Sequence, residues 1–196
     1  MTTGILLAAG SSTRFGSNKL QHPLEDGTPI AVAAARNLVA ALPDTIAVVR
    51  PGRLRLAAML RDAGCRVVTC RNAAEGMGAS LARAARAAKD ASGWVVALAD
   101  MPYIRPATIR VIADALAEGA AIAAPAFQGQ RGHPVGLARR FGDELMALRG
   151  DQGARHIIGS RPDWVTLYEV DDPGVLRDID IPADLRAGVN PGRNVG

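Results

Sequence analysis

The sequence predicts an α/β protein of three layers, in which helices cover both faces of a mainly parallel central sheet. Short runs rich in Val, Ile and Leu alternate along the chain with longer Ala-rich segments of helical periodicity, which is the pattern of repeated strand–helix units. Apolar residues make up 48% of the 196 residues and aromatic residues only 4%. A core of Ala, Val, Leu and Ile favours helices packed on strands over an aromatic-rich barrel.

The first strand is expected at 5–8, and a loop rich in Gly and Ser follows it from residue 9 to about residue 19. A helix should begin at Thr28-Pro29, because Thr can cap a helix and a proline in the first helical position gives up no hydrogen bond. This helix carries an apolar stripe through Val32, Ala35, Leu38 and Val39.

The following elements alternate in the same way. The second and third strands are expected at 45–49 and 66–70, on either side of a helix at 53–63 that Gly64 ends. A helix at 77–89 then leads to the apolar run 93–99. Such a run predicts a central strand that is buried on both faces.

Beyond the central strand, the pattern becomes less regular. A helix at 106–118, ended by Gly119, precedes a strand at 120–124, and the Gly-rich segment 128–136 is expected to form an irregular loop or hairpin. Short elements complete the predicted order, with helices at about 139–148 and 152–159 and strands at about 164–170 and 175–180. We expect one domain over 1–187 and a disordered tail over 188–196, since the tail shows no periodicity.

Composition and charge argue against several classes of protein. The net charge of +4 comes from scattered basic residues, and few aromatic residues are available to stack on bases, so an anionic small molecule is a better match than nucleic acid. The two cysteines, Cys65 and Cys70, show no metal-binding spacing. No apolar run reaches the roughly eighteen residues of a membrane span, and the N-terminus lacks a signal-peptide pattern. A reduced cytoplasmic protein without a membrane partner is expected.

The Gly- and Ser-rich loop after the first strand is a candidate phosphate-binding site. Small residues such as Gly10 let backbone N–H groups approach an anion, and Arg14 and Lys19 add full positive charges. The loop is not a Walker A motif, because five residues separate Gly10 from Gly16 and Ser follows. It is not a dinucleotide fingerprint either, because G-x-G-x-x-G is absent. Taken alone, the loop could also be a flexible turn with solvated charges.

Carboxylates follow two of the predicted strands. Asp100 comes directly after the central strand, and Asp178-Ile179-Asp180 ends the last strand with both carboxylates on one face. The carboxyl ends of strands face the ligand crevice in open α/β sheets, and Mg²⁺ prefers one or two carboxylates together with phosphate and water oxygens. A magnesium site formed by Asp100 and Asp180 is therefore expected. The alternative is helix capping, because Arg105-Pro106 and Pro182 begin helices nearby.

With these features the sequence resembles the MobA-like nucleotidyltransferases, and among them most closely the molybdenum cofactor cytidylyltransferases. The resemblance covers nearly the whole chain, from Leu6 to Leu185. It consists of six motifs in the family's order: Leu7-Ala8-Ala9-Gly10-x-Ser12-x-Arg14-x-Gly16-x-x-Lys19, Glu75-Gly76-Met77-Gly78-Ala79-Ser80-Leu81, Asp100-Met101-Pro102, Gly132-His133-Pro134-Val135, Gly150-Asp151-x-Gly153-Ala154-Arg155, and Asp178-Ile179-Asp180-Ile181-Pro182-x-Asp184-Leu185. Phe15 replaces the usual Met of the family and Ile181 the usual Thr.

The resemblance implies a Rossmann-like sheet, a divalent metal, and transfer of CMP from CTP to the terminal phosphate of molybdopterin, with release of pyrophosphate. It implies that Asp100 is the principal Mg²⁺ ligand and Asp180 the second. Arg14 and Lys19 would hold the β- and γ-phosphates and act as catalytic residues together with Asp100. The nucleotide would also contact a set of mostly small residues: Leu7, Ala8, Ala9, Gly10, Gly78 and Ser80.

The acceptor side of the site is less sharply defined by the motifs. His133 and Arg155 are candidate contacts to the phosphorylated pterin, although a structural hydrogen bond explains His133 and a surface position explains Arg155 equally well. A molybdoenzyme or its maturation chaperone would be the protein partner. Two other functions stay open, a sugar-phosphate nucleotidyltransferase and a non-catalytic carrier of the cofactor.

The choice of nucleotide is expected to depend on the loop. The family's guanylyl-transferring branch resembles Leu-Ala-Gly-Gly, whereas this chain has Leu7-Ala8-Ala9-Gly10. The methyl group of Ala9 occupies space that a second glycine would leave for a purine, so CTP is expected over GTP.

Overall fold

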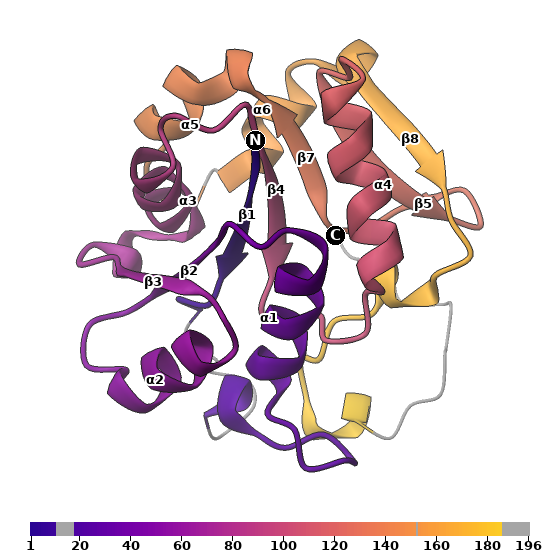
Figure 1. Cartoon of the computed structure of the whole chain (residues 1–196). Helices are drawn as coiled ribbons and strands as arrows, with labels where there is room; N and C mark the ends of the chain where they lie inside the picture. Colours follow the sequence, from indigo (N-terminus) through magenta and orange to yellow (C-terminus); the bar gives the residue numbers. More distant parts are fainter. Residues whose placement is uncertain (11–17, 152, 186–196) are drawn as a thin grey trace.

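Helices cover both faces of one sheet in the computed structural model, which describes residues 1–10, 18–151 and 153–185 (Figure 1). Within these ranges the strands join in the order β3-β2-β1-β4-β7-β5-β6, and β8 pairs with β5. Neighbours β1–β2, β1–β4, β2–β3 and β5–β8 are parallel, whereas β7 is antiparallel to β4 and β5, and β6 to β5. The strands are β1 Thr2–Leu7, β2 Thr45–Val49, β3 Arg66–Thr69, β4 Gly93–Leu98, β5 Ile122–Phe127, β6 Gln130–Arg131, β7 Val135–Ala138 and β8 Val165–Glu169.

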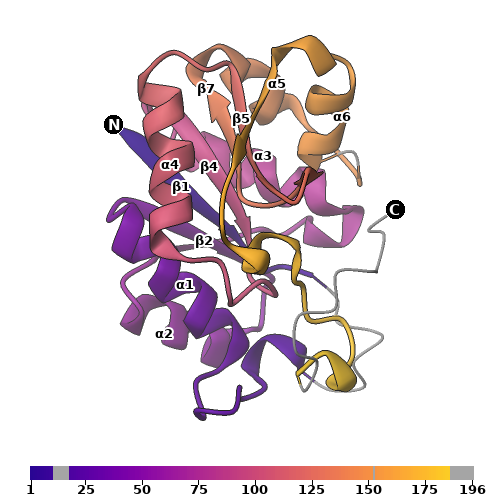
Figure 2. The ribbon, with the colours of Figure 1, turned by 90° about the vertical axis from the view of Figure 1, so that its right-hand side faces the viewer.

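The helices form the two outer layers, with α1, α2 and α4 on one face of the sheet and α3, α5 and α6 on the other (Figure 2). Successive residues of a strand alternate between the two faces, so that Ile5 and Trp94 pack with α3, and Leu6 and Val95 pack on the side of α1 and α4. The expected three-layer fold with a mainly parallel sheet is confirmed. The helices are α1 Ile30–Ala41, α2 Leu54–Asp62, α3 Met77–Ala87, α4 Pro106–Ala117, α5 Gly142–Ala147 and α6 Gly153–Gly159.

The register of β1 and β4 brings two sequence motifs to the same edge of the sheet. These parallel strands align from Thr2 with Gly93 to Leu7 with Leu98, and the backbone N–H of Ala99 then donates to the carbonyl of Leu7 at 3.2 Å. The beginning of the Gly-rich loop and Asp100 therefore leave the sheet next to each other, at the carboxyl ends of the central strands.

The predicted strand at 175–180 is wrong. Pro173–Leu176 forms a 3₁₀ turn instead, and residues 177–181 have no regular structure. Asp172 holds the turn, because its Oδ1 accepts a hydrogen bond from the N–H of Gly174 at 3.0 Å. Gly174 itself lies against the backbone of Tyr103, where a Cβ would come within 2.3 Å of the Tyr103 carbonyl oxygen. The chain is therefore bound to the segment after β4 rather than to a strand of the sheet.

Smaller differences concern where elements begin and end. Helix α1 starts at Ile30 with Pro29 as its N-cap, and Thr28 does not cap it, because its hydroxyl bonds to Asp26 at 3.1 Å. Short 3₁₀ turns that the sequence did not signal lie at Lys19–Gln21, Ala73–Glu75 and Pro162–Trp164. The helix expected to begin at Pro182 is the 3₁₀ turn Pro182–Leu185, and the helix expected from 139 begins with the 3₁₀ turn Arg139–Phe141. The expected hairpin at 128–136 is present as β5 and β6. None of the helices in the described ranges has the length and apolar character needed to cross a bilayer.

Candidate active site

Asp100 lies at the carboxyl end of β4, in the middle of the sheet. The apolar strand before it is buried, and Met101 directly after it is only 4% exposed, so the chain turns away from the sheet with the Asp100 carboxylate at the surface. Asp100 is not the cap of the following helix. The N-cap is Arg105, and Asp172 holds this end of the helix, because its Oδ2 accepts from the N–H of Arg105 at 2.8 Å and from the hydroxyl of Thr108 at 2.6 Å. Helix capping therefore does not explain the Asp100 carboxylate.

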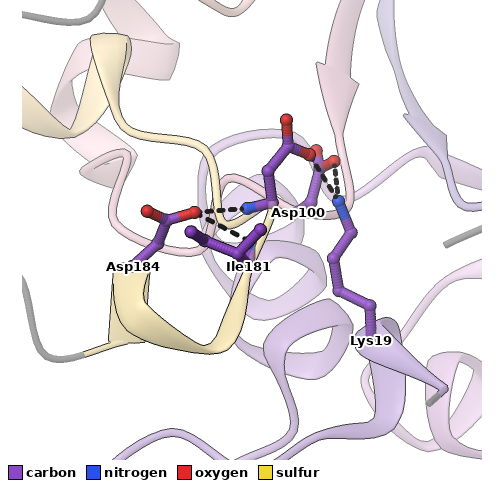
Figure 3. Close-up of polar contacts among 5 residues, drawn as sticks. Lys19, Asp100, Ile181 and Asp184 are labelled. Atoms are coloured by element: carbon purple, nitrogen blue, oxygen red, sulfur yellow. Dashed lines mark hydrogen bonds and ion pairs between the residues drawn. The ribbon is translucent and has the colours of Figure 1, made fainter. Parts of the chain in front are cut away.

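Asp180 reaches the same place from the other end of the chain. The backbone N–H of Ile179 donates to the carbonyl of Asp100 at 3.0 Å, and the Ile179 side chain is buried in a small apolar cluster with Ile30. Asp184 fixes the next residues, since its Oδ2 accepts from the N–H groups of Asp180 at 2.9 Å and Ile181 at 2.8 Å (Figure 3). The missing family Thr at position 181 is therefore not needed to hold this turn.

Lys19 joins the two carboxylates. Its Nζ lies 2.8 Å from Oδ2 of Asp100 and 3.1 Å from Oδ1 of Asp180 (Figure 3). Burial alone would lower the pKa of the Lys19 ammonium, but the charges and hydrogen bonds of Asp100 and Asp180 outweigh burial and raise the pKa overall. Lys19, Asp100 and Asp180, which sequence reasoning assigned to one site, are brought together by the fold.

A third carboxylate contributes to the charge of this cluster. Burial raises the pKa of Asp178, and the nearby negative charges of Asp180 and Asp100 raise it further. The described residues include no group of three or more His, Cys, Asp or Glu arranged as a metal cage. Two carboxylates that converge on one cation still fit Mg²⁺, because this ion commonly takes one or two carboxylates and leaves its other positions to phosphates and water.

A cavity of about 400 Å³ opens beside Asp100, within the size range of small-molecule sites. Five of the residues predicted to contact a nucleotide line it: Leu7, Ala9, Gly10, Ser80 and Asp100. Arg14, also predicted there, lies outside the described residues, as does the predicted tail 188–196.

Three of the predicted nucleotide contacts, Lys19, Ala8 and Gly78, do not line this cavity. Lys19 is linked to it through its ion pair with Asp100. Ala8 packs into the core on the opposite face of the sheet, with α1 and α4. Gly78 packs against the chain near α5, where its N–H donates to the carbonyl of Gly150 at 2.8 Å and a Cβ would come within 2.8 Å of two carbonyl oxygens. For Gly78 the structure gives a packing reason for glycine.

Sequence reasoning missed several residues of the cavity. Arg50 directly follows β2 and adds a positive charge to the cavity wall. Its Nε donates to the carbonyl of Ala9 at 2.5 Å, which connects the start of the Gly-rich loop to the neighbouring strand. Asp151 lines the opposite wall and lies close to Gly76. The position of Arg50 at the carboxyl end of a parallel strand could have signalled it, whereas Asp151 comes from a distant loop.

The two residues predicted to contact the acceptor lie on the side of β7 and α6. Burial lowers the pKa of His133 to about 4, the charge of Asp100 opposes this shift, and the charges of Arg131 and Arg155 add to it. Within the described parts of the chain, the buried Nδ1 of His133 has no hydrogen-bond partner. Arg155 is exposed on α6. The His133 imidazole is therefore neutral at neutral pH, and the charges of Asp100 and Arg155 both influence its pKa.

The fold and the site are those of a nucleotidyltransferase, with a cavity at the carboxyl ends of parallel strands and paired carboxylates beside a lysine. Residues 4–165 match the MobA-like NTP transferase domain, and the chain belongs to this family. Its sequence is 28% identical to the purine catabolism protein PucB of Bacillus subtilis (strain 168) over 191 residues, which are 92% of each chain.

Several solved structures are similar to this chain over 94% of its length. Rv0371c from Mycobacterium tuberculosis H37Rv is similar with a TM-score of 0.78 and 31% identity, over 94% of this chain and 95% of that chain. A complex of Rv0371c with manganese has a TM-score of 0.77 and 29% identity, over 94% of this chain and 96% of that chain. A nucleotidyl transferase from Methanothermobacter, Mth528, has a TM-score of 0.80 and 25% identity, over 94% of each chain.

Proposed function

We propose that the protein transfers CMP from CTP to the terminal phosphate of molybdopterin or of the molybdenum cofactor. An oxygen of the acceptor phosphate would attack the α-phosphorus of CTP, the bond between the α-phosphorus and the bridging oxygen would break, and pyrophosphate would leave. The observation that carries the proposal is the cluster of Lys19, Asp100 and Asp180 beside the cavity, in a chain of the MobA-like family. The sequence Leu7-Ala8-Ala9-Gly10, in place of the Leu-Ala-Gly-Gly of the guanylyl-transferring branch, supports the cytidylyl branch.

The residues would act by position and charge. Asp100 and Asp180 would hold Mg²⁺, which when bound offsets the negative charge of the phosphates. Lys19, together with Arg14, would stabilise the charge that grows on the departing pyrophosphate. The acceptor phosphate is already ionised at neutral pH, so its attack needs no general base. The neutral His133 would instead orient the acceptor through a hydrogen bond, and Arg155 would bind its phosphate.

The experiment that tests this function is incubation of the protein with each NTP, Mg²⁺ and molybdopterin, followed by mass spectrometry of the product. With CTP we expect a product heavier by one cytidylyl group, which is CMP less one water, together with pyrophosphate. Transfer to sugar phosphates but not to molybdopterin would favour a sugar-phosphate nucleotidyltransferase, and cofactor binding without any product would favour a carrier. We also propose that the protein acts in the cytoplasm and delivers its product to a molybdoenzyme or its maturation chaperone. Two buried, unpaired cysteines are consistent with that location.

Arg50 provides a test of the cavity as the nucleotide site. We expect Arg50→Met to raise the KM for CTP by roughly 10-fold, because it removes a charged hydrogen bond and one positive charge from the cavity wall. The value of kcat should change little. Arg53→Met is the matched control, since Arg53 is exposed and does not line the cavity. Equal effects of the two substitutions in steady-state kinetics would refute a role of Arg50 in nucleotide binding.

Ala9 is expected to contribute to the choice of base. Its methyl group lies at the cavity wall, and one methyl group usually discriminates by about 1–3 kcal/mol, or 10- to 200-fold. We expect wild-type kcat/KM to be at least about 10-fold higher for CTP than for GTP, and Ala9→Gly to reduce this ratio without necessarily reversing it.

Ala8→Gly is the matched control for this experiment, because Ala8 also carries one methyl group but packs on the other face of the sheet. It should leave the CTP to GTP ratio unchanged. A wild-type enzyme that used GTP at least as well as CTP, with the same acceptor, would end the cytidylyl assignment.

A further inference from the structure

The ammonium of Lys19 lies between the two carboxylates that we propose as metal ligands. It contacts one carboxylate oxygen of Asp100 and one of Asp180 at hydrogen-bond distance, and the Lys19 side chain is only 10% exposed. Mg²⁺ binds carboxylate oxygens at about 2.0–2.1 Å. An ion that used these same two oxygens would lie directly beside the ammonium, and the two positive charges would repel each other.

We propose that Lys19 is a resident counter-ion that blocks the metal site until a nucleotide draws it away. The phosphates of an incoming nucleotide would accept the ammonium, and the Oδ2 of Asp100 would then be open to the metal. Metal and nucleotide would bind synergistically, and free metal alone would bind weakly. This inference rests on the proposed function, because it needs a nucleotide triphosphate and a divalent metal at this site.

The local structure permits such an exchange without movement of the backbone. Lys19 begins the 3₁₀ turn Lys19–Gln21, and its carbonyl accepts from the N–H of His22 at 3.0 Å, so the turn is fixed. The side chain, in contrast, has a flexible four-carbon stem. Asp100 belongs both to the Lys19 ion pair and to the wall of the cavity. An anion in the cavity would therefore compete with Asp100 for the ammonium, which a change in the side-chain torsions of Lys19 could bring toward it.

A permanent ion pair is the competing interpretation. In that case Lys19 would only neutralise two carboxylates, and the metal would use other oxygens. The two interpretations differ in the effect of removing the ammonium. If Lys19 blocks the site, its loss exposes the Asp100 carboxylate and strengthens metal binding in the absence of nucleotide. If it does not block the site, its loss leaves the metal affinity unchanged.

The test is Mn²⁺ binding to the purified full chain, measured from the electron paramagnetic resonance signal of free Mn²⁺, with and without CTP and without an acceptor. For the wild type, we expect the protein to bind Mn²⁺ at least 10-fold more tightly with CTP than without it, after correction for the Mn²⁺ that free CTP binds. This effect lies within the usual range of about 5- to 150-fold for coupled sites. Lys19→Met should tighten Mn²⁺ binding without CTP by about 10-fold or more and lose most of the CTP effect. Lys89→Met, which removes the other, exposed lysine of the chain, should behave as the wild type.

Two further variants keep the test decisive. Lys19→Arg retains the positive charge and should bind Mn²⁺ as weakly as the wild type. Lys19→Met combined with Asp100→Asn should lose the gained affinity, because the exposed carboxylate is gone. Suppose that circular dichroism shows the Lys19→Met variant to be folded and that it binds Mn²⁺ no more tightly than Lys89→Met. This result would overturn the inference about Lys19 but not the proposed metal site. Absence of Mn²⁺ binding in every variant, with or without CTP, would overturn both the inference and the proposed metal site.

Discussion

Asp100→Ala is expected to lower the rate of nucleotide transfer by at least about two orders of magnitude, the usual cost of removing a principal electrostatic group from an active site. Asp100 is the carboxylate closest to Lys19, at 2.8 Å, and it belongs to the wall of the cavity. Its loss would remove one of two ligands for the metal and would leave Lys19 paired with Asp180 alone. The measurement is kcat for CTP-dependent transfer at saturating Mg²⁺.

The fold should survive this substitution, because the Asp100 side chain is 26% exposed and caps no helix. Asp180→Ala should have a similar effect on turnover, and Asp178→Ala a smaller one. Asp114→Ala is the matched control, since Asp114 is exposed on α4, away from the site. If Asp100→Ala turned over at a near-normal rate with excess Mg²⁺, Asp100 would not be the principal metal ligand.

The sheet could be predicted from the sequence because its strands are marked by composition alone. The apolar runs that became β2 and β4 are buried along almost their whole length, and Gly64 and Gly119, both with positive φ, follow α2 and α4 closely. The segment after β8 could not be predicted in this way. Its conformation depends on Asp172 and on contacts with Tyr103, which are more than sixty residues apart in the chain.

The same distinction applies to the site. Lys19, Asp100 and Asp180 were predicted as one group because each is a charged residue next to a recognisable motif, and the ion pairs place them together. The motifs were less reliable for small residues. Gly78 belongs to a family motif, yet it packs against Gly150 rather than lining the cavity. Arg50 and Asp151 line the cavity, but sequence reasoning gave them no role, although Asp151 belongs to a family motif and Arg50 follows a parallel strand.

Asp172→Ala is expected to lower the free energy of unfolding by about 3 kcal/mol, because it leaves buried donors without an acceptor. The Asp172 side chain is 3% exposed, and it accepts hydrogen bonds from the N–H groups of Arg105 and Gly174 and from the hydroxyl of Thr108. These bonds hold the N-terminal end of α4 and the turn that leads to Asp180. A loss of this size corresponds to a melting temperature lower by roughly 6–12 °C for a chain of this length.

The neighbouring Asp171 offers a matched control. Asp171 is exposed, and among the interactions of the described residues it contributes only its backbone carbonyl, to Arg105 at 2.7 Å. Asp171→Ala removes the same charge and should melt within about 2 °C of the wild type, since surface substitutions usually change stability by less than about 0.5 kcal/mol. Thermal unfolding of both variants decides the matter. Equal melting temperatures for the two would mean that the hydrogen bonds of Asp172 do not anchor this segment.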